Sequence, residues 1–296
     1  MFDNVLIGVD GRTGGDDAAA LARRLAAPDA HLTLATVYGA AGWPPSGAGL
    51  FLEDQQIEAE AFLEHEAEQW PGVHTVSACA STVGRGLHEL AVASRVDLLV
   101  VGSTHRGIPG KVLVGDDTRA TFNGAPCPIA IAPHGYAAAD QPLQRIGVGY
   151  DGTPESRRAL DAACWVAGHS GGEVSALWVL SLEDVRQHSP LPADWPAAGA
   201  AVVDQAQRAL DKIDGVTGVA LYGGPREELA RLSEEVDLLV VGSRRHGRFG
   251  AFHGSVSSYL ERHVSSALLV LPSEPAPAGA AQPAEPAVAW TTTAGV

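Results

Sequence analysis

The sequence is poor in lysine and cysteine, and it has no long apolar run. Lys111 and Lys212 are its only lysines, and 35 acidic residues against 20 basic ones give a formal net charge of −15. Such a surface repels a nucleic-acid backbone, and no basic stripe with interleaved aromatic residues offsets it. No apolar run is long enough to cross a bilayer, and the acidic N-terminal segment is unlike a signal peptide. We therefore expect neither nucleic acid nor a membrane as a partner.

The three cysteines, Cys79, Cys127 and Cys164, are odd in number and widely spaced. This spacing fits neither a disulfide framework nor a metal site, and it predicts reduced thiols in a cytoplasmic protein.

The chain of 296 residues repeats itself. NVLIGVDG near residue 4 recurs as RIGVGYDG near residue 145, and VDLLVVGS occurs in both halves. Three pairs of landmarks keep a nearly constant offset: Asp10 and Asp151 (141 residues), Asp97 and Asp237 (140), Gly115 and Gly254 (139). We predict a first domain at 1–133, a linker at 134–144, a second domain at 145–272, and a disordered Pro/Ala-rich tail at 273–296.

Apolar runs alternate with helical periodicity in each copy. In the first copy, five runs predict strands: Val5–Val9, Leu32–Val37, Val73–Ala78, Leu98–Val101 and Ile129–Ala132. Between strands, apolar residues recur at helical spacing. This alternation predicts an α/β fold: two tandem doubly wound domains, each a five-stranded parallel sheet with helices on both faces. The segment Tyr38–Leu50, rich in Pro and Gly, and the segment Leu182–Ala198, rich in Pro, predict long loops at the carboxyl edge of each sheet.

The first strand of each copy ends in an acid and a glycine, Asp10-Gly11 and Asp151-Gly152. At this edge of a parallel sheet, an acid can accept hydrogen bonds from ribose hydroxyls or an adenine amine. It can also cap the following helix, which is the commoner role for Asp at such a position. The sequence leaves both roles open.

The fourth strand of each copy runs into a glycine-containing loop. Glycines let backbone amides approach phosphate oxygens, and a helix N-terminus adds positive potential. Ordinary turns also contain such glycines. The candidate phosphate-binding residues are Gly102, Ser103, His105, Gly115 and Asp116 in the first copy, and Gly242, Ser243, Arg245, Gly254, Ser255, Val256 and Ser257 in the second.

These motifs together resemble the universal stress protein family in its tandem two-domain form. The resemblance rests on VDG and YDG, on DLLVVGS in both copies, and on GSVS with the closing CPIAIAP-type strand. It implies an adenine-nucleotide-binding stress or regulatory protein that binds ATP, with or without Mg²⁺, and has no dedicated catalytic machinery. The family's adenine packs near a valine at the end of strand two, which matches Val37 and Val179. The resemblance of strand five to the family's pairing strand implies an internal pseudo-dimer, and two chains could associate as a homodimer.

Neither copy fully matches the pattern of ATP-binding members, G-x2-G-x9-G-[ST]. The first has the right length but places His105 at the second glycine and Asp116 at the hydroxyl position. The second keeps Gly254-Ser255 but has Arg245 at the second glycine and is one residue shorter. Because a hydroxyl donates to phosphate and a carboxylate repels it, we expect tighter ATP binding in the second copy.

Three alternatives remain at this stage. A slow ATPase or nucleotidyl-transfer enzyme would need a metal ligand and a base, for which Asp116 and Asp117 are the candidates. An interaction scaffold would have lost its nucleotide sites. The segment 168–172 matches the G-x-S-x-G nucleophile elbow, but it follows a predicted helix and precedes a strand, so we interpret it as a helix C-cap turn.

Overall fold

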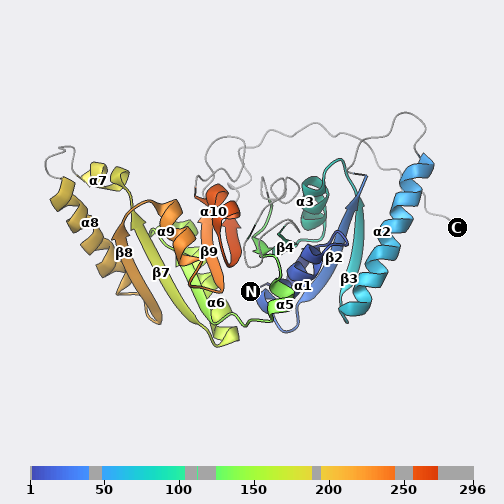
Figure 1. Ribbon diagram of the computed structural model, residues 1–296, viewed down its shortest axis with the longest axis horizontal. Helices are drawn as coiled ribbons and strands as arrows, with labels where there is room; N and C mark the ends of the chain where they lie inside the picture. Colours follow the sequence, from blue (N-terminus) through green and yellow to red (C-terminus); the bar gives the residue numbers. More distant parts are fainter. Residues whose placement is uncertain are drawn as a thin grey trace.

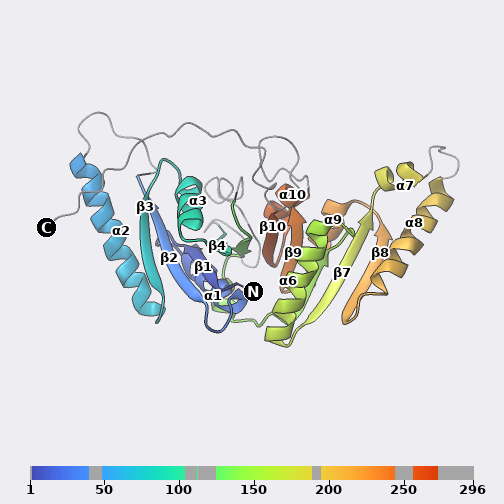
Figure 2. The same cartoon turned by 180° about the vertical axis from the view of Figure 1, so that it is seen from behind.

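Two α/β halves lie side by side and share one sheet (Figures 1 and 2). The computed structural model describes residues 2–39, 49–103, 112, 125–188, 195–243 and 256–272, with only the backbone at 49–51. The N-terminal half contains β1 (Asn4–Gly8), α1 (Thr13–Leu25), β2 (His31–Tyr38), α2 (Gly49–Gln69), β3 (His74–Cys79), α3 (Val83–Ala93), β4 (Leu98–Gly102) and β5 (Ile129–Ala132). After α5 (Tyr136–Ala139), the C-terminal half contains β6 (Arg145–Gly149), α6 (Pro154–Ser170), β7 (Glu173–Leu180), α7 (Leu182–His188), α8 (Trp195–Leu210), β8 (Val216–Tyr222), α9 (Pro225–Leu232), β9 (Leu238–Ser243), α10 (Ser257–His263) and β10 (Ala267–Pro272).

The sheet has ten strands in the order β3-β2-β1-β4-β5-β10-β9-β6-β7-β8. The described strand pairs inside each half are parallel. The halves meet where β5 and β10 pair antiparallel, with Ile131 opposite Leu268 and Ile129 opposite Val270. The predicted fold, two doubly wound five-stranded units, is therefore confirmed, and the expected pairing through strand five joins them into one mixed sheet.

Side chains of the central strands alternate between two apolar cores. In β4, Leu98 and Val100 face the cluster that includes α1, whereas Leu99 and Val101 face the cluster that includes Leu87 of α3. The LLVV run of β9 divides in the same way. Both clusters contain residues of both halves, so helices cover the two faces of one continuous sheet. Helices α2 and α8 lie at the two outer ends of the molecule (Figure 1).

One predicted loop is wrong. Within Leu182–Ala198, the structure forms α7 and the first turn of α8. The Ser181 backbone N–H and hydroxyl both donate to the Asp184 carboxylate, at 2.7 and 2.6 Å, and this contact holds the start of α7. A local side-chain cap therefore outweighs the Pro-rich composition of the segment. The first loop predicted, Tyr38–Leu50, falls mainly on residues 40–48, which lie outside the described residues.

The segment predicted as a linker is bound to α1. Asp17 of α1, 2% exposed, accepts hydrogen bonds from the backbone N–H groups of Gly135 and Ala137, both at 2.8 Å. The Arg24 guanidinium lies 5.1 Å from the ring centroid of Tyr136. Contacts of this kind hold α5 against the N-terminal half.

A second connection between the halves is Val112. Its side chain is fully buried in the core cluster that contains Leu260 and Val264, at the end of α10. Its backbone N–H donates to the Val264 carbonyl at 3.1 Å. A residue that follows β4 of the first half therefore packs into the second half.

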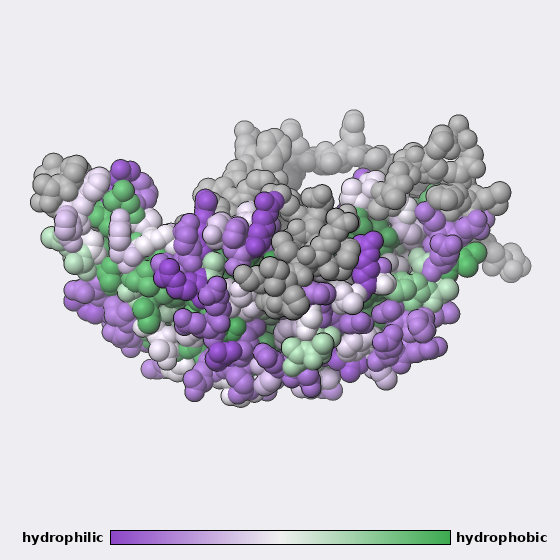
Figure 3. Space-filling view, in the orientation of Figure 1, coloured by the Kyte–Doolittle hydropathy of each residue, from purple (hydrophilic) through white to green (hydrophobic). Residues whose placement is uncertain are grey.

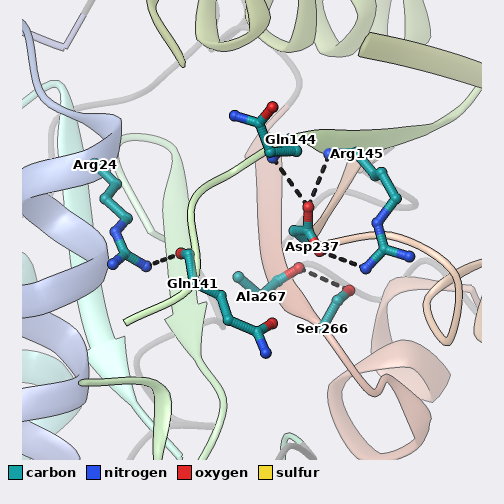
Figure 4. A network of polar contacts seen from close by, with 7 residues as sticks. All are labelled: Arg24, Gln141, Gln144, Arg145, Asp237, Ser266 and Ala267. Carbon is teal, nitrogen blue, oxygen red and sulfur yellow. Dashed lines mark hydrogen bonds and ion pairs between the residues drawn. The ribbon is translucent and has the colours of Figure 1, made fainter. Parts of the chain in front are cut away.

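The acid that precedes each LLVV run anchors the first strand of its half. Asp97 accepts hydrogen bonds from the backbone N–H groups of Asp3 (2.8 Å) and Asn4 (3.1 Å). Asp237 accepts hydrogen bonds from those of Gln144 (3.0 Å) and Arg145 (2.8 Å), and also from the Arg145 guanidinium at 2.7 Å (Figure 4). The acid of the shared VDLLVV motif therefore has the same structural role in both copies: it binds the backbone at the start of the first strand.

Much of the surface is hydrophilic, as the net charge implies (Figure 3). Within the described ranges, no helix combines the length and the apolar character that a membrane span requires.

Candidate functional site

A cavity of about 650 Å³ opens at the carboxyl ends of β6, β7 and β9. In the sheet, β6 lies between β9 and β7, which makes this the point where the strand order reverses. Ligands of doubly wound sheets bind at such points. The volume lies within the usual range for small-molecule sites. Six residues predicted from the sequence line it: Asp151, Val179, Gly242, Ser243, Val256 and Ser257.

Asp151 lies at the cavity wall and does not cap a helix. Thr153 is the N-cap of α6, and its hydroxyl accepts a hydrogen bond from the Ser156 backbone N–H at 3.3 Å. The Thr153 backbone N–H and hydroxyl both donate to one oxygen of Asp151. Gly152, at φ +75°, lets the chain turn between the acid and the cap. The more common capping role is thus wrong for Asp151, and Thr153 instead fixes the orientation of its carboxylate.

Ser243 presents a buried hydroxyl without a hydrogen-bond partner among the described residues. The side chain lines the cavity and is 3% exposed. Leaving a buried polar group unsatisfied costs about 1–3 kcal/mol, so such groups normally have a partner. A ligand or water in the cavity would supply one. Ser103, at the same position of the first copy, is equally buried at 3% exposure.

The glycines before these serines have a packing role. A Cβ on Gly102 would lie 2.0 Å from the Gly14 carbonyl oxygen, and one on Gly242 would lie 2.7 Å from backbone atoms of Glu155. The first turn of α1 crosses β4 at Gly102, and the first turn of α6 crosses β9 at Gly242. Both crossings are so close that only glycine leaves room for them. This requirement holds whether or not a phosphate binds nearby.

In the first copy, Asp10, Gly11, Val37, Gly102 and Ser103 also lie at the carboxyl ends of strands or directly after them. Asp10 is exposed and does not cap α1, since the N-cap is Arg12 and makes no side-chain cap. The Arg12 backbone N–H donates to Asp10 at 3.1 Å, and the guanidinium lies 3.6 Å from its carboxylate. The capping role is therefore wrong here too.

Part of the predicted phosphate loops falls outside the described residues. This part includes His105, Gly115, Asp116, Arg245, Gly254 and Ser255. Among the residues that are described, no three or more His, Cys, Asp or Glu side chains could hold a metal ion together.

The cavity residues that were missed from the sequence include Tyr150, Thr153, Trp178 and Asp184. Comparing the two copies position by position would have indicated the aromatic ones. Tyr150 stands where the first copy has Val9, and Trp178 where it has Thr36.

The G-x-S-x-G match is a helix C-cap, as predicted. Gly171 ends α6 in the left-handed conformation, and the Gly172 backbone N–H donates to the Ala167 carbonyl at 3.1 Å. Ser170 is the last residue of that helix and precedes β7, so it does not occupy a strand-to-helix elbow.

Comparison with known proteins shows relatives along most of the chain. The universal stress protein family matches residues 1–133 and 142–272. A universal stress protein of Mycobacterium tuberculosis is 27% identical over 276 residues, covering 86% of this chain and 92% of its own. One of Mycolicibacterium smegmatis is 26% identical over 289 residues, covering 90% and 96%. The crystal structure of a universal stress protein from Archaeoglobus fulgidus has a TM-score of 0.66 at 16% identity, covering 92% of this chain and 99% of that one.

Proposed function

Because this chain belongs to the universal stress protein family, we propose that it binds an adenine nucleotide in the cavity of its C-terminal half. The ligand is ATP, with or without Mg²⁺, and the protein acts by binding or sensing it in a stress response. The observation that carries the proposal is the buried, unpartnered hydroxyl of Ser243 in that cavity.

The polar groups of the cavity suit the two ends of a nucleotide. A hydroxyl at Ser243 can donate to a phosphate oxygen, and Ser257 lines the same cavity. Asp151, held by Thr153, can accept hydrogen bonds from ribose hydroxyls or an adenine amine. The sequence continues from Ser243 into Arg244 and Arg245, which carry charge opposite to that of phosphate.

We propose binding without dedicated catalysis. The acids that a hydrolytic mechanism would use, Asp116 and Asp117, lie outside the described residues. The assay is release of ADP by the full chain with ATP and Mg²⁺. Less than one ADP per chain over hours supports a binding protein, and multiple turnovers would favour the enzyme.

Cytoplasmic location and association into a homodimer stay predictions. All three cysteines are free in the structure, which fits a reducing compartment.

Two measurements test nucleotide binding. Protein purified without added ligand should release an adenine nucleotide on denaturation, identified by mass spectrometry. Calorimetry with ATP should then show binding that Ser243→Ala weakens by about 12- to 150-fold, because a hydrogen bond to a charged group contributes about 1.5–3 kcal/mol. Ser103→Ala is the matched control and should leave the C-terminal site unchanged. Absence of any ATP binding would favour the interaction scaffold.

A further inference from the structure

An aromatic pair in the cavity wall distinguishes the C-terminal half. Trp178 of β7 and Tyr150, directly after β6, pack edge to face with ring centroids 5.4 Å apart at 79°. Both line the cavity. The first copy has Thr36 and Val9 at these positions, and both side chains are buried.

The indole of Trp178 is held from several sides. A Cβ on Gly152 would lie 3.0 Å from its Cη2 atom, so its edge lies directly beneath the turn after Asp151. It also packs against the small core cluster of Leu180, Val202 and Ala206, which joins β7 to α8. Trp178 is therefore a rigid aromatic group beside the cavity and loses little entropy when a ligand binds.

The first half fills the corresponding place differently. There the ring of Phe62, from α2, lies against Gly11, with its Cε2 atom 3.2 Å from where a Cβ would be. At the position that corresponds to Trp178, strand β2 carries Thr36, which is 9% exposed. The first half has Tyr38 two residues farther along, at the end of β2, so it is the aromatic side chain at the position of Trp178 that is particular to the second half.

We propose that Trp178 recognises the base of the bound nucleotide by stacking, an inference that rests on the proposed function. Ser243 lies at the end of β9, and β6 separates β9 from β7. Neighbouring strands are about 4.8 Å apart, so the strands that carry Ser243 and Trp178 are about 10 Å apart. That span suits phosphates at one end of the cavity and a base at the other. Asp184, on α7 directly after β7, lines the cavity and disfavours phosphate at that end.

The test uses the full chain and calorimetry with ATP. Stacking of a base on an aromatic side chain predicts that Trp178→Ala weakens ATP binding by about 5- to 150-fold. Trp178→Phe, which keeps an aromatic face, should retain most of the affinity. If Trp178 only supported the turn after Asp151, an aromatic side chain would not be needed at this position. Trp178→Leu would then bind ATP as tightly as Trp178→Phe.

Tryptophan emission provides a second readout that does not depend on the alanine variant folding. ATP should change the emission of the wild-type chain, and Trp178→Phe should abolish that change while still binding ATP. Trp165→Phe is the matched control. Trp165 lies on α6, nine residues beyond the cavity-lining Ser156 and about 14 Å farther along the helix. It should keep the ATP-dependent change.

Either of two results overturns the role of Trp178: unaltered ATP affinity in folded Trp178→Ala, or a full ATP-dependent emission change in Trp178→Phe. Both leave nucleotide binding itself intact. If the wild-type chain binds no adenine nucleotide, it is the proposed function that fails.

Discussion

Replacing Asp237 with Asn should destabilise the protein more than the same change at Asp97. Both acids accept two backbone N–H groups from the start of the first strand of their half. Only Asp237 also binds a guanidinium, that of Arg145 at 2.7 Å. An Asn side chain keeps one acceptor oxygen but loses the charge. Its NH2 group also faces backbone N–H groups, which are donors themselves.

The magnitude follows from the number and exposure of these bonds. Hydrogen bonds to a charged group contribute about 1.5–3 kcal/mol each, and Asn retains part of one of them. The Arg145 side chain is 61% exposed, so its ion pair adds at most about 1 kcal/mol. We expect Asp237→Asn to lower the free energy of unfolding by about 2–4 kcal/mol and the melting temperature by about 4–16 °C. The cost at Asp97 should be about 1 kcal/mol smaller.

The effect should depend on pH with a definite sign. Burial raises the pKa of Asp237, but the hydrogen bonds from the Arg145 side chain and from the backbones of Arg145 and Gln144 outweigh it and lower the pKa. A carboxyl with a lower pKa in the folded state stabilises the fold above its unfolded pKa, about 3.9, and loses that contribution as pH falls through the folded value. The difference in the free energy of unfolding between wild type and Asp237→Asn should therefore be largest at pH 7 and decrease below about pH 4.

Urea unfolding followed by circular dichroism measures both effects, at pH 7 and at pH 3.5. Added salt should narrow the difference between the Asp237 and Asp97 variants, because it screens the exposed guanidinium. Equal stability of wild type and Asp237→Asn at pH 7 would refute the anchoring role. A gap that does not shrink at pH 3.5 would refute the assignment to an ionised carboxylate.

Three further outcomes are expected. Gly102→Ala should destabilise the protein by about 3 kcal/mol or more, because the added Cβ would meet backbone atoms. Gly168→Ala, with open space around the added Cβ, should be neutral or stabilising by up to about 1 kcal/mol. Thermal melts of the two variants test this contrast. Burial, together with the charge of Asp97, raises the pKa of Cys127 to about 12, so a thiol reagent at pH 8 should label it only after denaturation, whereas the two exposed cysteines should react in the native protein. ATP titrations should show weaker binding in Ser255→Asp and stronger binding in Asp116→Ser; the reverse would mean that the tighter site is in the first half.

Local patterns were enough to predict the fold and the edge of the sheet that carries the site. LLVV alternates between two cores because successive side chains of a strand point to opposite faces, which needs only the local period. The repeat then placed Asp151, Val179 and Ser243 at one edge, since the carboxyl ends of parallel strands lie together. The short helix at Leu182–His188 was missed because the Ser181–Asp184 cap outweighed composition.

The sequence by itself determined two α/β halves, their parallel strands and the acid and glycine at the end of each first strand. Only the tertiary structure decided that Thr153 caps α6 and leaves Asp151 at the cavity. It alone showed that Ser243 has a buried hydroxyl without a described partner, and that Trp178 rather than a helix residue lies beneath Gly152. Periodicity depends on neighbours along the chain, whereas burial, hydrogen-bond satisfaction and cavity shape depend on side chains that folding brings together from distant positions.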